Sequence, residues 1–160
     1  MRYFLCVLVT LAWGLWFGGL VATFLFINRL FDTMIALDLR TVFDRVAPGQ
    51  FLMSERFELV MGMFSLVVTA GLWAMLRTRA ATWAFIVLAI TAALAFTKAM
   101  YITPRMLALI HPGIPPTAEF KKLHGLSMGA GSLEILLLLI VAAALPALFA
   151  PRAIPREESV

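Results

Sequence analysis

Apolar residues along this chain gather in four long runs, at residues 3–28, 59–76, 80–103 and 126–150. The first two runs contain no charged residue, the third contains only Lys98, and the fourth contains only Glu134. Each run is close to the about 20 residues that a helix needs to cross a hydrocarbon core of about 30 Å. The first run is also longer than the about 7–15 apolar residues of a signal peptide, so we expect it to be retained. The pattern predicts an all-α, integral membrane four-helix bundle.

The connections between these runs differ in length and character. Residues 77–81 leave room only for a tight antiparallel turn between the second and third spans. In residues 29–57, apolar positions recur at helical spacing between charged ones, which indicates either an amphipathic helix on the membrane surface or an extension of the first helix. Pro48-Gly49 is expected to end that segment, and Pro104 to end the third span. Residues 105–123 are rich in proline and are expected to form a structured turn, and residues 151–160 an exposed C-terminal tail after a single domain, 1–150.

Composition narrows the class of protein further. Hydrophobic residues make up 62% of the chain and charged residues 14%, against about 45–50% and about 25% in soluble domains. A soluble enzyme, a disordered chain and a free-standing nucleic-acid-binding domain are therefore poor fits. The net charge of +4 comes from basic residues that flank the apolar runs, where they suit anionic lipid headgroups. We expect the lipid bilayer, and no nucleic acid, as a partner.

Basic residues do not decide how the chain is oriented in the membrane. The N-terminus, the short connection and the C-terminal tail share one side and carry five basic residues, whereas the two long connections carry eight. This excess would place the long connections in the cytoplasm. Longer connections also have more room for basic residues, so both orientations are retained.

Two charged side chains inside the spans require an explanation. Glu134 lies about eight residues, or about 12 Å, inside the fourth span, where a carboxylate facing lipid costs at least about 2.5–3.5 kcal/mol. Glu134 should therefore face the bundle interior. Lys98 is its natural partner, because it enters the membrane from the same side and its long stem can cover most of the difference in depth.

Further polar residues belong to the same half of the membrane. Four-helix connectivity places all of them toward the long connections: Asn28, Glu58, Lys98, Arg105, His124 and Glu134. In one interpretation Lys98 and Glu134 form a structural ion pair, Glu58 caps a helix start, and His124, just before the fourth span, hydrogen-bonds at the interface. In the other, these groups line a one-sided polar vestibule that binds a cation, a metal or a proton.

Small residues recur at four-residue spacing on two predicted helices. Gly14, Gly18 and Ala22 share one face of the first helix, and Gly125 and Gly129 share one face of the fourth. Such faces allow close helix packing within a bundle or between copies. The short sequence signatures of common catalytic sites are absent, and paired histidines at membrane depth, which haem would need, are absent too. We expect neither an enzyme nor a bound cofactor.

Three motifs resemble the transmembrane protein 205 family, a domain of unknown function numbered 4149. They are residues 12–26 in the first span, Thr103-Pro104-Arg105 at the exit of the third, and residues 120–127 with His124-Gly125-Leu126-Ser127 before the fourth. Their order, spacing and four spans agree over residues 5–145. One departure is Gly131, where the family often has asparagine two turns after the histidine. The resemblance implies a small multi-pass protein of a bacterial cell membrane, with an undefined activity for which transport or resistance roles are suspected.

Two functional hypotheses follow from the sequence. In the first, the protein transports or exports a small solute or metal species through the vestibule, as a homo-oligomer, with Glu134 as the binding or proton-coupled carboxylate. Lys98 would be its counter-ion, and His124 and Arg105 would form the vestibule. In the second, the protein is a non-catalytic accessory or assembly subunit that packs against a larger membrane complex.

Overall fold

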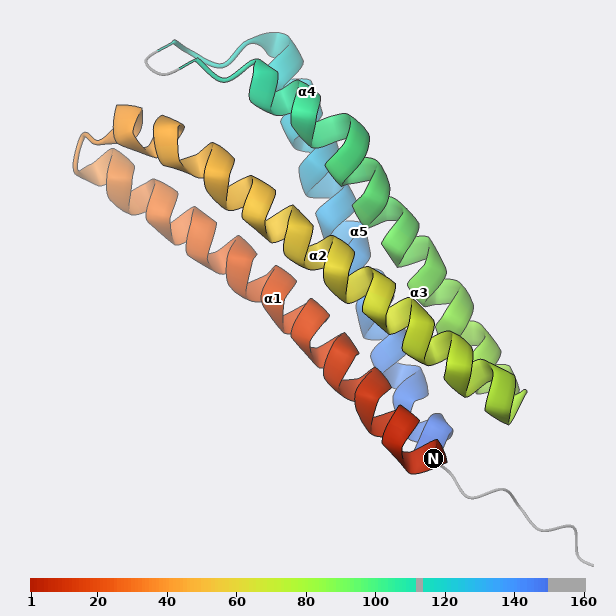
Figure 1. The fold of residues 1–160 in the computed structure, drawn as a ribbon. Helices are drawn as coiled ribbons and strands as arrows, with labels where there is room; N and C mark the ends of the chain where they lie inside the picture. Colours follow the sequence, from red (N-terminus) through yellow and green to blue (C-terminus); the bar gives the residue numbers. More distant parts are fainter. Residues whose placement is uncertain (112–113, 150–160) are drawn as a thin grey trace, which may run out of the picture.

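The computed structural model describes residues 1–111 and 114–149, which form long helices packed side by side (Figure 1). In chain order these are α1 (Arg2–Ala36), α2 (Arg40–Leu76), α3 (Arg79–Thr97), the π-helical turn η1 (Lys98–Ile102), α4 (Thr103–Ala108) and α5 (Ala118–Phe149). Because α3, η1 and α4 follow one another without a break, the described residues contain four helical rods, each long and apolar enough to cross a membrane. The predicted all-α four-helix membrane bundle is confirmed.

The turn between α2 and α3 is as short as the sequence predicts. Arg77 ends α2 in the left-handed conformation, with φ 51°, and its backbone N–H donates to the carbonyl of Trp73. Thr78 then caps α3, because its hydroxyl accepts a hydrogen bond of 3.3 Å from the N–H of Ala81. A side-chain oxygen at this position satisfies one of the otherwise unpaired N–H groups of the first turn.

The first long connection is almost entirely helical. Helix α1 continues to Ala36 and α2 begins at Arg40, so the two helices extend side by side beyond the first apolar run. Phe31 and Phe43 meet across this extension, with ring centroids 5.1 Å apart. The prediction that Pro48-Gly49 ends a helix is wrong, since Pro48 lies inside α2. Proline removes one backbone hydrogen bond there, and the contacts of α2 with α1, such as that of Phe43 with Phe31, help to offset this loss.

Two other boundaries also differ from the sequence prediction. Pro104 does not end the third rod, which continues to Ala108, and α5 begins at Ala118, well before the predicted start of the fourth span. The remaining connection is therefore 109–117, of which 112 and 113 lie outside the described residues. The predicted tail, 151–160, and the last residue of the predicted domain also lie outside them.

The bundle is tightly closed at one end only. Near the N-terminus of α1, the indole of Trp13 donates a hydrogen bond of 2.7 Å to the carbonyl of Leu138 on α5. Trp16 is fully buried, and Gly62 on α2 gives it room, because a Cβ there would lie 3.2 Å from the Trp16 ring. Toward the opposite end the α1–α2 pair diverges from the rod of α3, η1 and α4 (Figure 1).

The predicted small-residue faces are not packing surfaces within this chain. A Cβ added at Gly14, Gly18, Gly125 or Gly129 would meet nothing within 4 Å among the described residues. Close approach occurs instead at Gly62 and at Gly19, where an added Cβ would lie 2.3 Å from the ring of Phe57 on α2. The faces that contain Gly14, Gly18 and Ala22 on α1 and Gly125 and Gly129 on α5 thus remain uncovered.

Replacing Trp16 by alanine should lower the free energy of unfolding by about 3–5 kcal/mol, because truncation leaves a large cavity in the closed end. The matched control is Trp83→Ala, since Trp83 is 64% exposed and its loss opens no internal cavity. Reversible unfolding in detergent micelles measures both. Equal destabilisation by the two substitutions would contradict the packing described above.

Candidate functional site

A buried cluster of charged side chains lies where the helices begin to diverge. Its centre is Lys98, the first residue of η1, which is 5% exposed. The ammonium group of Lys98 donates to Oε2 of Glu58 on α2 and lies 3.3 Å from Oε1 and 3.5 Å from Oε2 of Glu134 on α5. Glu134 is fully buried. One lysine thus links three of the four rods.

A second polar contact lies beside the first. The hydroxyl of Thr103, the first residue of α4, donates to Oε1 of Glu55, one turn before Glu58 on α2. Ser54 adds a hydrogen bond of 3.2 Å from its hydroxyl to Oε1 of Glu58. Helix α2 therefore contributes two carboxylates to the cluster, each with a hydroxyl donor.

The π-helical turn explains why Lys98 and Thr103 both face α2. On an α-helix, residues five positions apart point about 140° away from each other. In η1 the N–H of Thr103 instead bonds to the carbonyl of Lys98, five residues earlier, so both side chains lie on one face. Pro104 favours this wider turn, because its ring collides with the carbonyl four residues before it and it has no N–H to donate.

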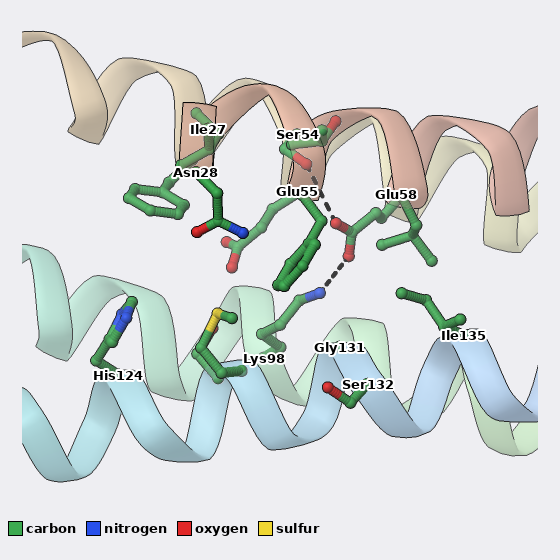
Figure 2. Close-up of a pocket in the computed structure, with 16 residues that line it drawn as sticks. Ile27, Asn28, Ser54, Glu55, Glu58, Lys98, His124, Gly131, Ser132 and Ile135 are labelled. Carbon is green, nitrogen blue, oxygen red and sulfur yellow. Dashed lines mark hydrogen bonds and ion pairs between the residues drawn. The ribbon is translucent and has the colours of Figure 1, made fainter. Parts of the chain in front are cut away.

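A cavity of about 320 Å³ lies against this cluster (Figure 2). Its polar floor consists of Ser54, Glu55, Glu58 and Lys98. The two walls come from α1 and α5, and they are mostly apolar or small. Helix α1 contributes Leu20, Thr23, Phe24, Ile27 and Asn28, and α5 contributes His124, Ser127, Met128, Gly131, Ser132 and Ile135. We call this cavity the vestibule.

The vestibule lies toward one end of the bundle. All of its charged groups lie in the half of the bundle that carries the long connections, as do His124 and Asn28. A second cavity of about 280 Å³ shares Ile27, Asn28, Phe51 and His124 with the vestibule and extends toward the 109–117 connection. The shared residues place the two cavities next to each other between the cluster and that end of the bundle.

The structure changes the roles of three residues from the sequence analysis. Glu134 contacts Lys98 but does not line the vestibule, so among the described residues the carboxylates that face the cavity are those of Glu55 and Glu58. Glu58 does not cap a helix start, because it lies in the interior of α2. Arg105 is exposed and lines neither of the two cavities described above.

His124 lies at the junction of the two cavities. It does not precede the last helix, as the sequence analysis expected, but lies within α5. Its imidazole stacks on the ring of Phe120, with centroids 5.7 Å apart and an interplanar angle of 7°. His124 therefore contributes to the lining of both cavities.

Sequence reasoning missed Glu55, Ser54 and Thr103. The second apolar run begins at residue 59, so Glu55 falls in the connection that precedes it. The available signal was the spacing of Glu55 and Glu58, because residues three apart on a helix share a face. Within residues 1–111 and 114–149, no three or more His, Cys, Asp or Glu side chains are grouped to hold a metal ion.

Comparisons with protein-family models, with curated proteins and with solved structures find no match to this chain. The resemblance to the transmembrane protein 205 family therefore stays a prediction.

Replacing Lys98 by methionine should lower the free energy of unfolding by about 3–5 kcal/mol, because it leaves two buried carboxylates without a cation. Combining Lys98→Met with Glu134→Gln should cost less than the sum of the two single substitutions, by about 0.5–3 kcal/mol. A double-mutant cycle of unfolding in detergent measures this coupling. Lys121→Met, at an exposed position on α5, is the matched control. Additive effects, or equal effects of Lys98→Met and Lys121→Met, would show that the ion pair does not hold the helices.

Proposed function

We propose that this protein transports a small solute across the membrane, with the vestibule as its binding site. The observation that supports this most directly is the cavity within the bundle that has Glu55, Glu58 and Lys98 on its floor. Charged side chains inside a membrane are costly, and they commonly mark pathways for ions, protons or substrates. A purely structural ion pair would not need a cavity beside it.

Polar groups continue from the vestibule into the closed end of the bundle. Glu58, Ser65 and Thr69 occupy the inward face of α2, and Gly62 lies between them on the same face. The hydroxyls of Ser65 and Thr69 are fully buried and have no hydrogen-bond partner among the described residues. Because unpaired buried hydroxyls are unusual, this face supports a path that opens and hydrates in a second conformation.

A complete conduit would involve a second copy of the chain. Four helices alone enclose little space for a pathway, and the divergence of the rods leaves the vestibule between α1 and α5 partly uncovered. The bare faces at Gly14 and Gly18 on α1 and at Gly125 and Gly129 on α5 would let another helix approach closely. We therefore propose a homo-oligomer as the transporting unit, in a bacterial cell membrane as the family resemblance implies.

The same bare faces favour a second candidate function. An accessory or assembly subunit would use them to pack against a different, larger membrane protein. In that case Lys98, Glu58 and Glu134 would only fix the register of the helices, and the vestibule would be covered by the partner.

Gly131→Leu tests the transport proposal. Gly131 lines the vestibule, and a Cβ there meets nothing within 4 Å in the described structure, so we expect a leucine side chain to occupy part of the cavity. In proteoliposomes we expect uptake of small solutes by the purified protein to fall at least about tenfold, an increase in the barrier of about 1.4 kcal/mol. Gly71→Leu is the matched control, because Gly71 is exposed, equally free of neighbours and remote from the vestibule.

Equal flux through Gly131→Leu and Gly71→Leu would exclude the vestibule from the transport path. Uptake no faster than in protein-free liposomes, together with a second protein that copurifies in stoichiometric amount, would favour the accessory subunit.

A further inference from the structure

The positive and negative groups of the buried cluster are unequal in number. The cluster contains three carboxylates, of Glu55, Glu58 and Glu134, and the single ammonium of Lys98. With every group ionised its formal charge is −2. Such a charge inside a membrane is expensive, so the balance must be supplied either by protons on the carboxylates or by a cation in the cavity.

Glu55 is the carboxylate best placed to meet such a cation. It is 7% exposed, yet it lines the vestibule. Lys98 contacts Glu58 and Glu134, and in the described part of the chain no cationic side chain lies within 4.0 Å of Glu55. The hydroxyl of Thr103 bonds to one of its oxygens but brings no charge. The carboxyl group of Glu55 is therefore buried, lines the cavity and has no cationic partner among the described residues.

The side chains on the walls of the vestibule indicate which other chemical groups a ligand would carry. Above the acidic floor, α1 and α5 contribute the apolar side chains of Leu20, Phe24, Ile27, Met128 and Ile135, and α2 contributes the ring of Phe51. Aromatic faces attract organic cations, quaternary ammonium groups in particular. At about 320 Å³ the cavity lies at the small end of ligand sites.

We infer that the vestibule binds small amphipathic organic cations, and that these compete with protons for the carboxylates of Glu55 and Glu58. This inference rests on the proposed function, because it names the substrate class of the same site. The cationic group contacts the carboxylates on the floor, and the apolar part lies between α1 and α5. When the cation enters, a carboxyl proton leaves for water, so one positive charge replaces another. Such an exchange couples export of the cation to entry of a proton.

Titratable side chains lie in or next to the vestibule on α2, η1 and α5. Glu58 lies on the same helix as Glu55, η1 contributes Lys98, and α5 contributes Glu134 behind Lys98 and His124 toward the second cavity. Helix α1 contributes no titratable side chain to the described lining. A proton added to any of these three glutamates, or to His124, makes the surroundings of the cavity more positive, so we expect cation binding to weaken as the pH falls.

Two probes of nearly equal shape, one charged and one neutral, distinguish the effect of charge on binding from the effect of size. Benzyltrimethylammonium carries a positive charge at every pH, and neopentylbenzene has carbon in place of the nitrogen. Binding of each is measured to the intact protein in nanodiscs of zwitterionic lipid, with empty nanodiscs as the baseline. We expect the cation to bind at least about tenfold more tightly than the neutral probe, and its affinity to fall at least about tenfold between about pH 8 and about pH 5.

Glu55→Gln should weaken binding of the cation at least about tenfold, because it removes the buried charge, and should leave the neutral probe unaffected. Glu119→Gln is the matched control, since Glu119 is exposed on α5 and lies outside the vestibule. If Glu55→Gln does not fold, the pH dependence of cation binding by the unmodified protein provides the test. The charge of the probe does not change with pH, so any change in affinity comes from the protein.

Three other outcomes would each overturn part of the account. If both probes bind equally and Gly131→Leu abolishes both, the inference of a cation is wrong while the proposed solute site survives. If the cation binds but its affinity does not change with pH, competition with protons is excluded. If Gly131→Leu leaves binding of both probes unchanged, the vestibule is not the site, and the proposed function falls with the inference.

Discussion

The ammonium group of Lys98 lies between carboxylates from two other helices, and the open half of the bundle is organised around it. A charge at this depth is stable only when it is paired and shielded from hydrocarbon. Glu58 on α2 and Glu134 on α5 provide that pairing, so η1, α2 and α5 are held in one register. Glu134 contacts Lys98 but does not line the cavity, whereas Glu55 and Glu58 do.

Two prolines shape the surroundings of this cluster. Pro104 follows the π-helical turn that brings Thr103 onto the same face as Lys98, opposite Glu55 and Glu58 on α2. Pro48 lies in the part of α2 that extends with α1 beyond the bilayer-length run. At the other end the contact of Trp13 with Leu138 and the burial of Trp16 close the bundle. One half of the bundle is thus closely packed around Trp16, and the other half contains the polar vestibule.

Much of this arrangement could be predicted from the sequence. The four apolar runs determine the number of spanning helices, and the cost of burying Glu134 in lipid identifies it as an interior residue next to Lys98. The roles of Glu55, Glu58 and Thr103 could not be predicted in this way. Pro48 and Pro104 were interpreted as helix ends because local propensity disfavours helix there, whereas packing in the folded bundle overrides that preference. Because the apolar run that predicts the second span begins at residue 59, Glu55 lies outside every predicted span.

We expect water to reach the charged cluster from the side of the long connections, because the vestibule and the second cavity lie between the cluster and that end of the bundle. Labelling of Ser54→Cys by a charged, membrane-impermeant thiol reagent tests this most directly, in a protein whose Cys6 is replaced by alanine. Ser54 is half-buried on the floor of the vestibule, whereas Val67 on the same helix is 67% exposed but faces outward in the middle of the span. We predict rapid labelling of Ser54→Cys from one side of the membrane only, and protection of Val67→Cys. Protection of Ser54→Cys from both sides would contradict the account.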